Sequence, residues 1–294
     1  MTSPVVELPE AQIRPLIAAY DASVRARRWH TLFVIACIVV AMTLASVSAE
    51  ISPAHLVENI RRFPSYIIRL FLLENGQPAW TDVAEWFWGL PRWLRLLGET
   101  LLMAYVGTLL GAAAASGLAF LAAANVGPGR WLRFAVRRVC ELCRTVPLLV
   151  FALLFVIAFG LGPLAGVLAV VIHTLGALVK QFAEVIENID MKPVEGVAST
   201  GAPWHVAMRY GALPQVMSNF VSYTLLRFEI NVRESAVMGF VGAGGIGQDL
   251  IEAIRKFYYT DVSAILLLIL ITVAIIDTLT SRVRHQLLGR EERR

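Results

Sequence analysis

Long apolar runs constrain the fold of this chain more than any other feature of its sequence. The first run, residues 31–48, is uncharged and about as long as a helix that crosses the hydrocarbon of a bilayer. Further runs follow at 99–125, 146–161, 164–186, 215–236 and 262–280. Hydrophobic residues make up 57% of the chain and charged residues 16%, whereas a soluble domain is about a quarter charged. The sequence therefore predicts an all-α integral membrane protein with about six transmembrane helices.

Arginine clusters between the runs predict how the chain crosses the membrane. They lie before the first run, between the second and third runs, and after the sixth run: Arg25, Arg27, Arg28, Arg130, Arg133, Arg137, Arg138, Arg144, Arg282, Arg284, Arg290, Arg293 and Arg294. Six spans place both termini on one side, and positive loops resist translocation, so that side is the cytoplasm. The basic residues form no single stripe, so nucleic acid is not an expected partner.

Residues 50–97 then lie outside the cytoplasm. They are amphipathic around Leu56 to Leu73 and carry a tryptophan cluster: Trp80, Trp86, Trp88 and Trp93. Tryptophan is enriched in the headgroup layer of a membrane, where its ring contacts both lipid and water. We therefore expect these tryptophans to anchor the segment at the membrane surface rather than to contact substrate. The first run ends like a signal-peptide cleavage site, but it exceeds the roughly 7–15 residues of a signal-peptide core, which favours a retained span.

Small residues share one face of the second run. Gly107, Gly111 and Ala115 recur at every fourth position. Such faces let two helix backbones approach closely in lipid. The partner helix belongs either to this chain or to a second copy.

The three cysteines predict neither disulfides nor a metal site. Cys37, Cys140 and Cys143 form no disulfide framework. The last two make a C-x-x-C, but no second pair or nearby His completes four metal ligands. We expect them to pack within helices.

The segment MKPVEGVASTGAPWHVAMRYGALPQV, residues 191–216, predicts a short helical hairpin on the cytoplasmic side. Pro193 suits the first turn of a helix that runs to Thr200, and Gly201 can take the left-handed conformation that ends it. Pro203 can begin a second helix that runs to Tyr210. Gly211 and Pro214 then break the chain before the fifth span.

This hairpin resembles the EAA loop of permease subunits of ABC importers, in which Glu-Ala-Ala, three residues, Gly and nine residues precede Ile-x-Leu-Pro. The residues that carry the likeness are Glu195, Ala198, Gly201, Leu213 and Pro214. The departures from the pattern are Gly196, Val197 and Gly211. The resemblance implies that the hairpin docks in a groove of a separate ATPase, with Glu195 on the ATPase surface and Gly201 supplying the bend.

The resemblance extends over about Gly98 to Leu287 and is to permeases of phosphonate importers. RTVPLLVFALLFVIAFGLGP and RESAVMGFVGAGGIGQDL are similar to those permeases, whose fold is of the methionine-permease type. It implies a type I ABC importer permease fold in the bacterial cytoplasmic (inner) membrane. Such permeases work as two permease chains with two ATP-binding cassette subunits and an extracytoplasmic solute-binding protein, so the resemblance implies a homodimer here.

The expected division of the chain follows from these segments. Residues 1–97 hold an N-terminal cytoplasmic segment, the first span and the external Trp-rich region. Residues 98–287 form the permease domain, with the coupling loop at 191–216, and residues 288–294 form a cytoplasmic tail. No Gly-x-x-x-x-Gly-Lys-Ser/Thr loop occurs in the sequence, so ATP and Mg are expected on the partner ATPase and no cofactor on this chain.

The stretch GFVGAGGIGQDL, residues 239–250, contains the Gly-x-Gly-x-x-Gly of a dinucleotide-binding turn. That turn needs a preceding strand in a parallel sheet, and here a membrane run precedes it. Glycine-rich backbone at membrane depth must be satisfied by protein or by a water-filled cavity. We expect a narrow or hinged part of the translocation path, or else a tight structural turn, at Gly242, Gly244, Gly245 and Gly247.

Polar side chains inside the predicted spans are further candidates, because charge in a bilayer is costly unless it faces a cavity or a partner. His173 lies near the middle of the fourth span, and Glu229, Asn231, Arg233 and Glu234 lie in the fifth. The planar fork of Arg233 suits an oxyanion, and a pair with Glu234 or Glu229 is the equal alternative. His173 is more often a packed, hydrogen-bonded residue than a ligand.

The sequence therefore predicts a transport protein that is not itself an enzyme: the membrane-spanning permease subunit of an ATP-driven importer for phosphonate or a related phosphorus oxyanion. The alternatives are a permease for another small solute, such as phosphate, phosphite or an amino acid, and an ion-coupled secondary transporter. A membrane-embedded enzyme would need a clustered His/Asp/Glu site, and the candidates here are dispersed.

Overall fold

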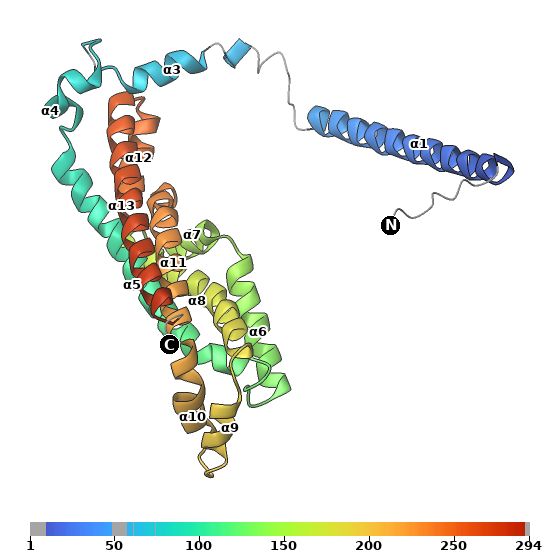
Figure 1. The fold of residues 1–294 in the computed structure, drawn as a ribbon. Coiled ribbons are helices and arrows are strands. Elements are labelled where there is room, and N and C mark those ends of the chain that lie inside the picture. Colours follow the sequence, from blue (N-terminus) through green and yellow to red (C-terminus); the bar gives the residue numbers. More distant parts are fainter. Residues whose placement is uncertain (1–9, 49–57, 61, 74, 292–294) are drawn as a thin grey trace, which may run out of the picture. The chain divides into compact units, whose positions relative to one another are not determined.

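The computed structural model describes residues 10–48, 58–60, 62–73 and 75–291. Over that range the chain is helical, and its β-structure is limited to one isolated bridge between Leu72 and Pro78 (Figure 1). The chain divides into a unit of residues 1–67 and a unit of residues 68–294. The all-α prediction is confirmed.

The first unit is dominated by one long helix, α1 (Glu10–Ser48). Its segment Ala18–Ser46 is long and apolar enough to cross a membrane, and its apolar side chains are exposed. The predicted first span, 31–48, lies in this helix. Leu56, where the predicted amphipathic segment begins, lies outside the described residues.

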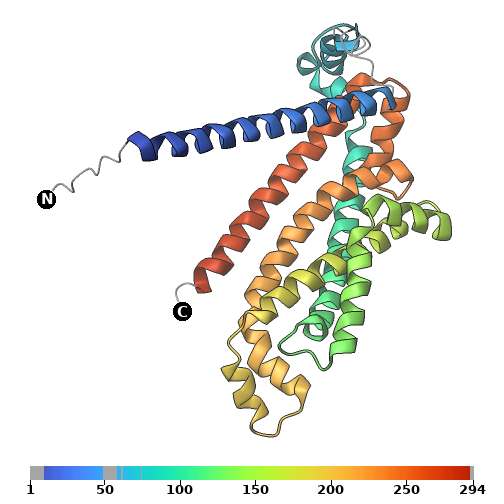
Figure 2. The same cartoon turned by 90° about the vertical axis from the view of Figure 1, so that its right-hand side faces the viewer.

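The second unit is a bundle of long helices (Figure 2). Its elements are α5 (Leu90–Ala122), α6 (Arg130–Thr145), α7 (Leu148–Phe159), α8 (Pro163–Glu187), α11 (Leu213–Met238), α12 (Ile246–Arg255) and α13 (Tyr259–Glu291). Helix α5 packs along α8, and α11 packs on α5, α8 and α13. Of the described helices in this unit, α5, α8 and the segment Tyr259–Gln286 are long and apolar enough to span a membrane by themselves.

The small-residue face of α5 packs on α8 of the same chain. A Cβ atom built on Gly107 would lie 2.5 Å from Val170 Cγ1, and one built on Gly111 would lie 2.9 Å from Thr174 Cβ. Ala115 is fully buried in the same face. The glycines therefore permit a close contact between two helices of one chain, which decides between the two partners that the sequence left open.

The predicted third span, 146–161, corresponds to α7, which is long and apolar enough to cross a membrane only together with α6, as a bent pair. Helix α7 has 12 residues and is about 18 Å long, which is shorter than the hydrocarbon layer. It bends by 89° from α6. The break lies at Val146 and Pro147, because proline has no N–H to donate and drives the residue before it into extended backbone; Val146 has ψ 126°.

The chain between α8 and α11 forms the predicted hairpin, with one difference. Helix α9 (Lys192–Ala198) is followed by Gly201 at φ +80° and by α10 (Trp204–Ala207). The predicted break at Gly211 and Pro214 is wrong, because the π-helical turn Met208–Ala212 joins α10 directly to α11. A wider turn relieves the clash between a proline ring and the carbonyl four residues earlier, so the helix continues through Pro214.

The end of the unit opposite the hairpin is built around the tryptophan cluster. The indole of Trp86, which ends α4 (Val83–Trp86), donates to Ser263 Oγ at 3.0 Å, and Trp88 donates to Asp261 Oδ1 at 2.9 Å. Trp93 is buried against α12 and α13, whereas Trp80 and Trp88 are exposed. The cluster therefore joins the start of α5 to the start of α13.

Candidate functional site

The hairpin presents the predicted coupling residues at one end of the bundle (Figure 1). Glu195, Ala198 and Gly201 are exposed on α9 and the turn after it. Leu213 is partly buried and Pro214 exposed at the start of α11. The structure therefore keeps the five residues within one projecting element, with a carboxylate on its surface.

Apolar and polar contacts hold the hairpin rigidly to the bundle. Val194 is buried against Gly211, where an added Cβ would lie 2.7 Å from Val194 Cα. The Gln215 side chain bridges the start of the hairpin, accepting from Asp190 N at 3.1 Å and donating to Asp190 O at 3.0 Å. The indole of Trp204 donates to Val126 O at 2.7 Å in the loop between α5 and α6. A force applied to the hairpin would therefore reach α5, α8 and α11 directly.

A polar groove runs between α8 and α11 next to the hairpin. Its volume is about 540 Å³, and its lining is Gln181, Glu184, Val185, Asn188, Ile189, Asp190, Gln215, Asn219 and Tyr223. On α11, Gln215, Asn219 and Tyr223 recur at four-residue steps and so stand on successive turns of one side of the helix. Groups of this polarity do not face lipid, so water or protein must cover the groove in the membrane.

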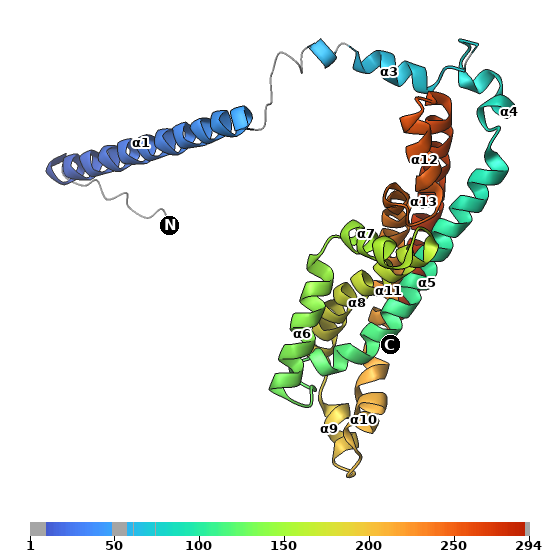
Figure 3. The same cartoon turned by 180° about the vertical axis from the view of Figure 1, so that it is seen from behind.

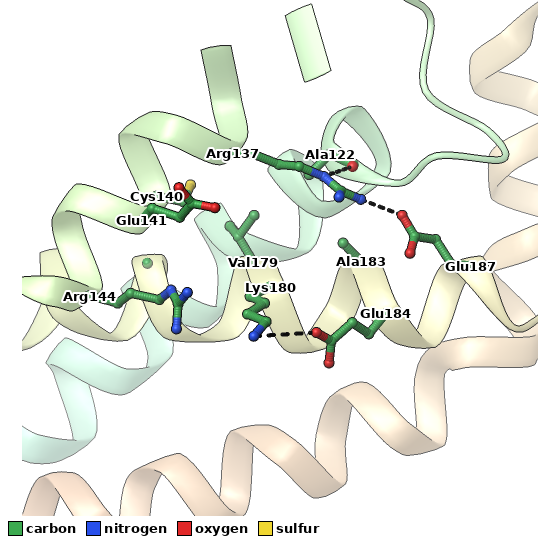
Figure 4. A pocket seen from close by; sticks show the side chains of 11 residues that line it. Ala122, Arg137, Cys140, Glu141, Arg144, Val179, Lys180, Ala183, Glu184 and Glu187 are labelled. Carbon is green, nitrogen blue, oxygen red and sulfur yellow. Dashed lines mark hydrogen bonds and ion pairs between the residues drawn. The ribbon is translucent and has the colours of Figure 1, made fainter. Parts of the chain in front are cut away.

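A smaller cavity of about 140 Å³ extends this polar surface from α8 to α6 (Figure 4). Arg137 reaches across from α6 to pair with Glu187 and donates to Ala122 O at 2.8 Å. On α8, Lys180 lies 3.6 Å from Glu184, and Glu184 also lines the groove. The polar face is therefore continuous over α6, α8 and α11.

The groove points along α11 toward three charged or titratable side chains. Arg227 lies one turn beyond Tyr223, and its Nη2 is 3.6 Å from Glu234 Oε2. His173, on the same face of α8 three turns before Glu184, lies within electrostatic reach of both. The structure thus brings together two predicted site residues, His173 and Glu234, with an arginine that was not proposed as a site residue.

Arg233 is placed differently. It forms an ion pair with Glu229, one turn earlier in α11, and its side chain is 54% exposed. The structure therefore favours the paired state of Arg233 over a role as a free oxyanion ligand.

A buried polar contact fixes α11 against α5 and α8. Asn231 is fully buried, and its Nδ2 donates to Thr108 Oγ1 at 2.7 Å and to Thr174 Oγ1 at 2.8 Å. Interhelical hydrogen bonds of this kind stabilise helix pairs in lipid by about 0.6 kcal/mol each. Asn231 therefore sets the position of the helix that carries Arg227 and Glu234.

The glycine loop closes the bundle beyond these charges. Gly242, Gly244 and Gly245 have φ of +81°, +87° and +77°, a backbone conformation that residues other than glycine rarely adopt. Gly247 has no room for a side chain, since a Cβ would lie 2.3 Å from Ala236 O. Each of the four glycines is therefore required by the backbone geometry.

The loop packs tightly on α5 and on the start of α8. Added Cβ atoms would lie 3.0 Å from Pro163 N at Gly244 and 2.4 Å from Thr100 Oγ1 at Gly245. The Ile246 amide donates to Thr100 Oγ1 at 2.9 Å, and the Gly162 amide donates to Gly242 O at 3.0 Å. Helix α11 and the 3₁₀ turn Gly239–Val241 precede the loop, where a dinucleotide-binding turn needs a strand, so the dinucleotide interpretation is excluded.

An apolar cluster stands between this loop and the polar groove. It consists of Leu148, Ala152, Ala169, Val170, Met238 and Ala243. On α8, Ala169 and Val170 lie one turn before His173, so the polar face ends where this cluster begins. The polar side chains therefore give way to apolar ones between the groove and the glycine loop.

At the end opposite the hairpin, one ion pair links α5 to α12 and a second lies at the end of α12. Arg92 Nη2 lies 2.7 Å from Asp249 Oδ1, and Lys256 Nζ lies 2.5 Å from Glu252 Oε1. The Lys256 ammonium holds the pKa of the Glu252 carboxyl below its usual range, by a hydrogen bond and by its charge. Both groups are fully exposed, so solvent screens the pair.

Within the described part of the chain, no group of three or more His, Cys, Asp or Glu side chains could hold a metal ion. Cys37, Cys140 and Cys143 are free thiols.

Comparison with known proteins identifies the family. Residues 107–290 match the family model described as binding-protein-dependent transport system inner membrane component. This chain belongs to that family. The permease is 40% identical over 195 residues to the putative phosphite transport system permease protein HtxC of Stutzerimonas stutzeri, covering 66% of this chain and 69% of the relative. It is therefore a multi-pass inner-membrane component of a transport system.

A second relative and a solved structure agree with the family. The permease is 50% identical over 117 residues to the putative cryptic phosphonate transport system permease protein PhnE2 of Escherichia coli strain K12, covering 40% of this chain and 96% of the relative. A chain of the MetNI methionine ABC transporter, in an inward facing conformation, matches with a TM-score of 0.58 at 21% identity, over 66% of this chain and 95% of that chain. The predicted methionine-permease-like, type I ABC importer fold is confirmed.

Sequence reasoning missed several residues of the permease's polar face. Four of them, Lys180, Glu184, Asn219 and Tyr223, were not proposed as site residues. Polar side chains recur at four-residue steps along α11, and this pattern could have identified Asn219 and Tyr223. The pairing of α8 with α11, which turns these steps into a groove, is a tertiary contact that no local pattern specifies.

Proposed function

We propose that this permease forms the membrane path of an ATP-driven importer for phosphonate or a related phosphorus oxyanion. The observation that carries the proposal is the 40% identity to a permease named for phosphite transport, which covers 66% of this chain and 69% of the relative. A relative named for phosphonate transport and the cationic groups on the polar face add support. Phosphorus oxyanions are anionic, and a path for them needs polar, partly cationic walls.

The energy source in this proposal is a separate ATPase that docks on the hairpin. Glu195 is exposed on α9, and the hairpin is bonded to α5, α8 and α11 through Trp204 and Gln215. An exposed carboxylate on a projecting hairpin suits docking to the ATPase. Because the hairpin is tied to the bundle, a movement of the ATPase would be transmitted to the groove. Coupling is assigned to Glu195, Ala198, Gly201, Leu213 and Pro214.

Substitution of Glu195 tests this coupling. Glu195→Arg should reduce co-purification of the ATPase by about tenfold or more, because it reverses a charge at the contact. Glu85→Arg, an exposed charge reversal in α4 at the other end of the unit, is the matched control and should leave co-purification unchanged. Equal recovery of the ATPase with both variants would remove the coupling assignment.

We further propose that the termini and the hairpin are cytoplasmic, and that residues 98–287 form the transport domain. Helix α13 runs from α12 back toward the hairpin end of the unit (Figure 3), which supports a cytoplasmic end of this helix. Residues 50–97 would lie outside, where an extracytoplasmic solute-binding protein delivers its ligand.

The alternative solutes are phosphate, phosphite and an amino acid. Ligand binding to the companion binding protein decides among them, since that protein selects what the permease receives. An ion-coupled secondary transporter is the other class, and it predicts uptake that persists without an ATPase.

A further inference from the structure

We propose that Arg227, one turn beyond the polar groove on α11, binds the substrate oxyanion. This inference rests on the proposed function and names the residue that contacts the cargo. The sequence had named a different arginine, Arg233, as a candidate oxyanion ligand, with an ion pair as the equal alternative.

The position of Arg227 follows from the geometry of α11. Asn219 and Tyr223 line the groove of about 540 Å³, and Arg227 stands on the next turn of the same stripe. Beyond it lies the apolar cluster that includes Met238 and Ala243. A solute that moves from that cluster toward the cytoplasm would therefore meet Arg227 first and the groove afterwards.

The guanidinium of Arg227 is buried without sufficient partners. Its side chain is 11% exposed, and its Nε and Nη2 atoms are buried with no hydrogen bond to a described residue. The nearest carboxylate oxygen, Glu234 Oε2, is 3.6 Å from Nη2, beyond a hydrogen bond, and is likewise without a hydrogen-bond partner. A buried charge with unmet donors destabilises the protein, so a ligand that meets those donors would be strongly favoured.

A phosphorus oxyanion has the complementary chemistry. Two of its oxygens can accept from Nε and Nη2 in parallel, which a lysine ammonium cannot reproduce. Glu234 would then be the resident counter-ion, which balances the charge of Arg227 while the path is empty. Arg233 cannot take this role in the same way, because it is half exposed and already paired with Glu229.

The test separates oxyanion binding from a purely structural ion pair. If Arg227 only neutralises Glu234, then the double variant R227Q/E234Q, which removes both charges, should restore assembly and uptake together. If Arg227 binds the oxyanion, the double variant should assemble and show ATPase activity stimulated by the liganded binding protein, while uptake of methylphosphonate or inorganic phosphate falls by about tenfold or more. R227K should show the same loss, because it keeps the charge without the fork.

The matched control is Arg138→Lys, since Arg138 is an exposed arginine on α6 that pairs with Glu141. It should leave both uptake and stimulated ATPase unchanged. Uptake by R227Q/E234Q or by R227K at the level of the unmodified complex would overturn the assignment of Arg227. Absence of ATP-dependent oxyanion uptake by the unmodified complex would instead contradict the proposed function.

Discussion

At the scale of single residues, the glycine loop shows what a local pattern can and cannot specify. The sequence predicted that its glycines serve backbone geometry and not a nucleotide, and three of them have positive φ. It could not predict that Thr100 and Pro163 are the neighbours that exclude a side chain, since these lie far away in the chain. A hinge or gate at this loop stays a proposal.

Gly244→Ala tests whether the geometry of this loop matters for transport. The alanine must adopt φ near +87° with its Cβ 3.0 Å from Pro163 N, which costs about 1–2 kcal/mol for the backbone alone. We expect a lower melting temperature and a severalfold loss of uptake, measured on the complex in proteoliposomes. Gly117→Ala, a helical glycine of α5 with open space around it, should be neutral in both measurements. Normal uptake by Gly244→Ala would argue against a gate.

At the scale of elements, Pro147 explains a sharp bend between α6 and α7 that the sequence did not predict. An apolar run of 146–161 suggested one span, yet the proline near its start separates an amphipathic α6 from the short α7. The opposite case is Pro214, where a break was expected and a π-helical turn carries the helix through. Whether a proline ends a helix depends on tertiary packing, and here Gly211 on that turn packs against Val194.

Trp204→Ala tests the hairpin as a rigid lever. The change removes the hydrogen bond to Val126 O, which ties α10 to the loop between α5 and α6. We expect ATP hydrolysis to continue, while the number of substrate molecules transported per ATP hydrolysed falls severalfold. The reason is that a movement of the hairpin would be only partly transmitted to α5. Trp131→Ala, on the 78% exposed tryptophan of α6, should keep the ratio unchanged. An unchanged ratio in Trp204→Ala would contradict the lever.

At the scale of the whole molecule, the polar face over α6, α8 and α11 cannot face lipid. We propose that a second copy covers it and that the path runs between the two copies. The sequence predicted the membrane class, the approximate spans and the hairpin, because hydropathy and charge position record them. It did not predict the polar face, which exists only once the helices are packed.

Cross-linking tests this arrangement. In a variant free of Cys37, Cys140 and Cys143, Gln181→Cys on the groove should form a disulfide-linked dimer on mild oxidation. Leu270→Cys, a 65% exposed position on the apolar side of α13, should not. The converse pattern on a non-reducing gel would place the second copy elsewhere.

The central claim is that a separate ATPase drives a phosphorus oxyanion through this permease. The most direct measurement is uptake of labelled phosphonate, phosphite and phosphate into proteoliposomes that contain the permease, its ATPase and its binding protein. We predict accumulation only with ATP, and none when the ATPase carries a substitution that blocks hydrolysis. Accumulation by the permease alone under an ion gradient, with no ATPase present, would contradict the account.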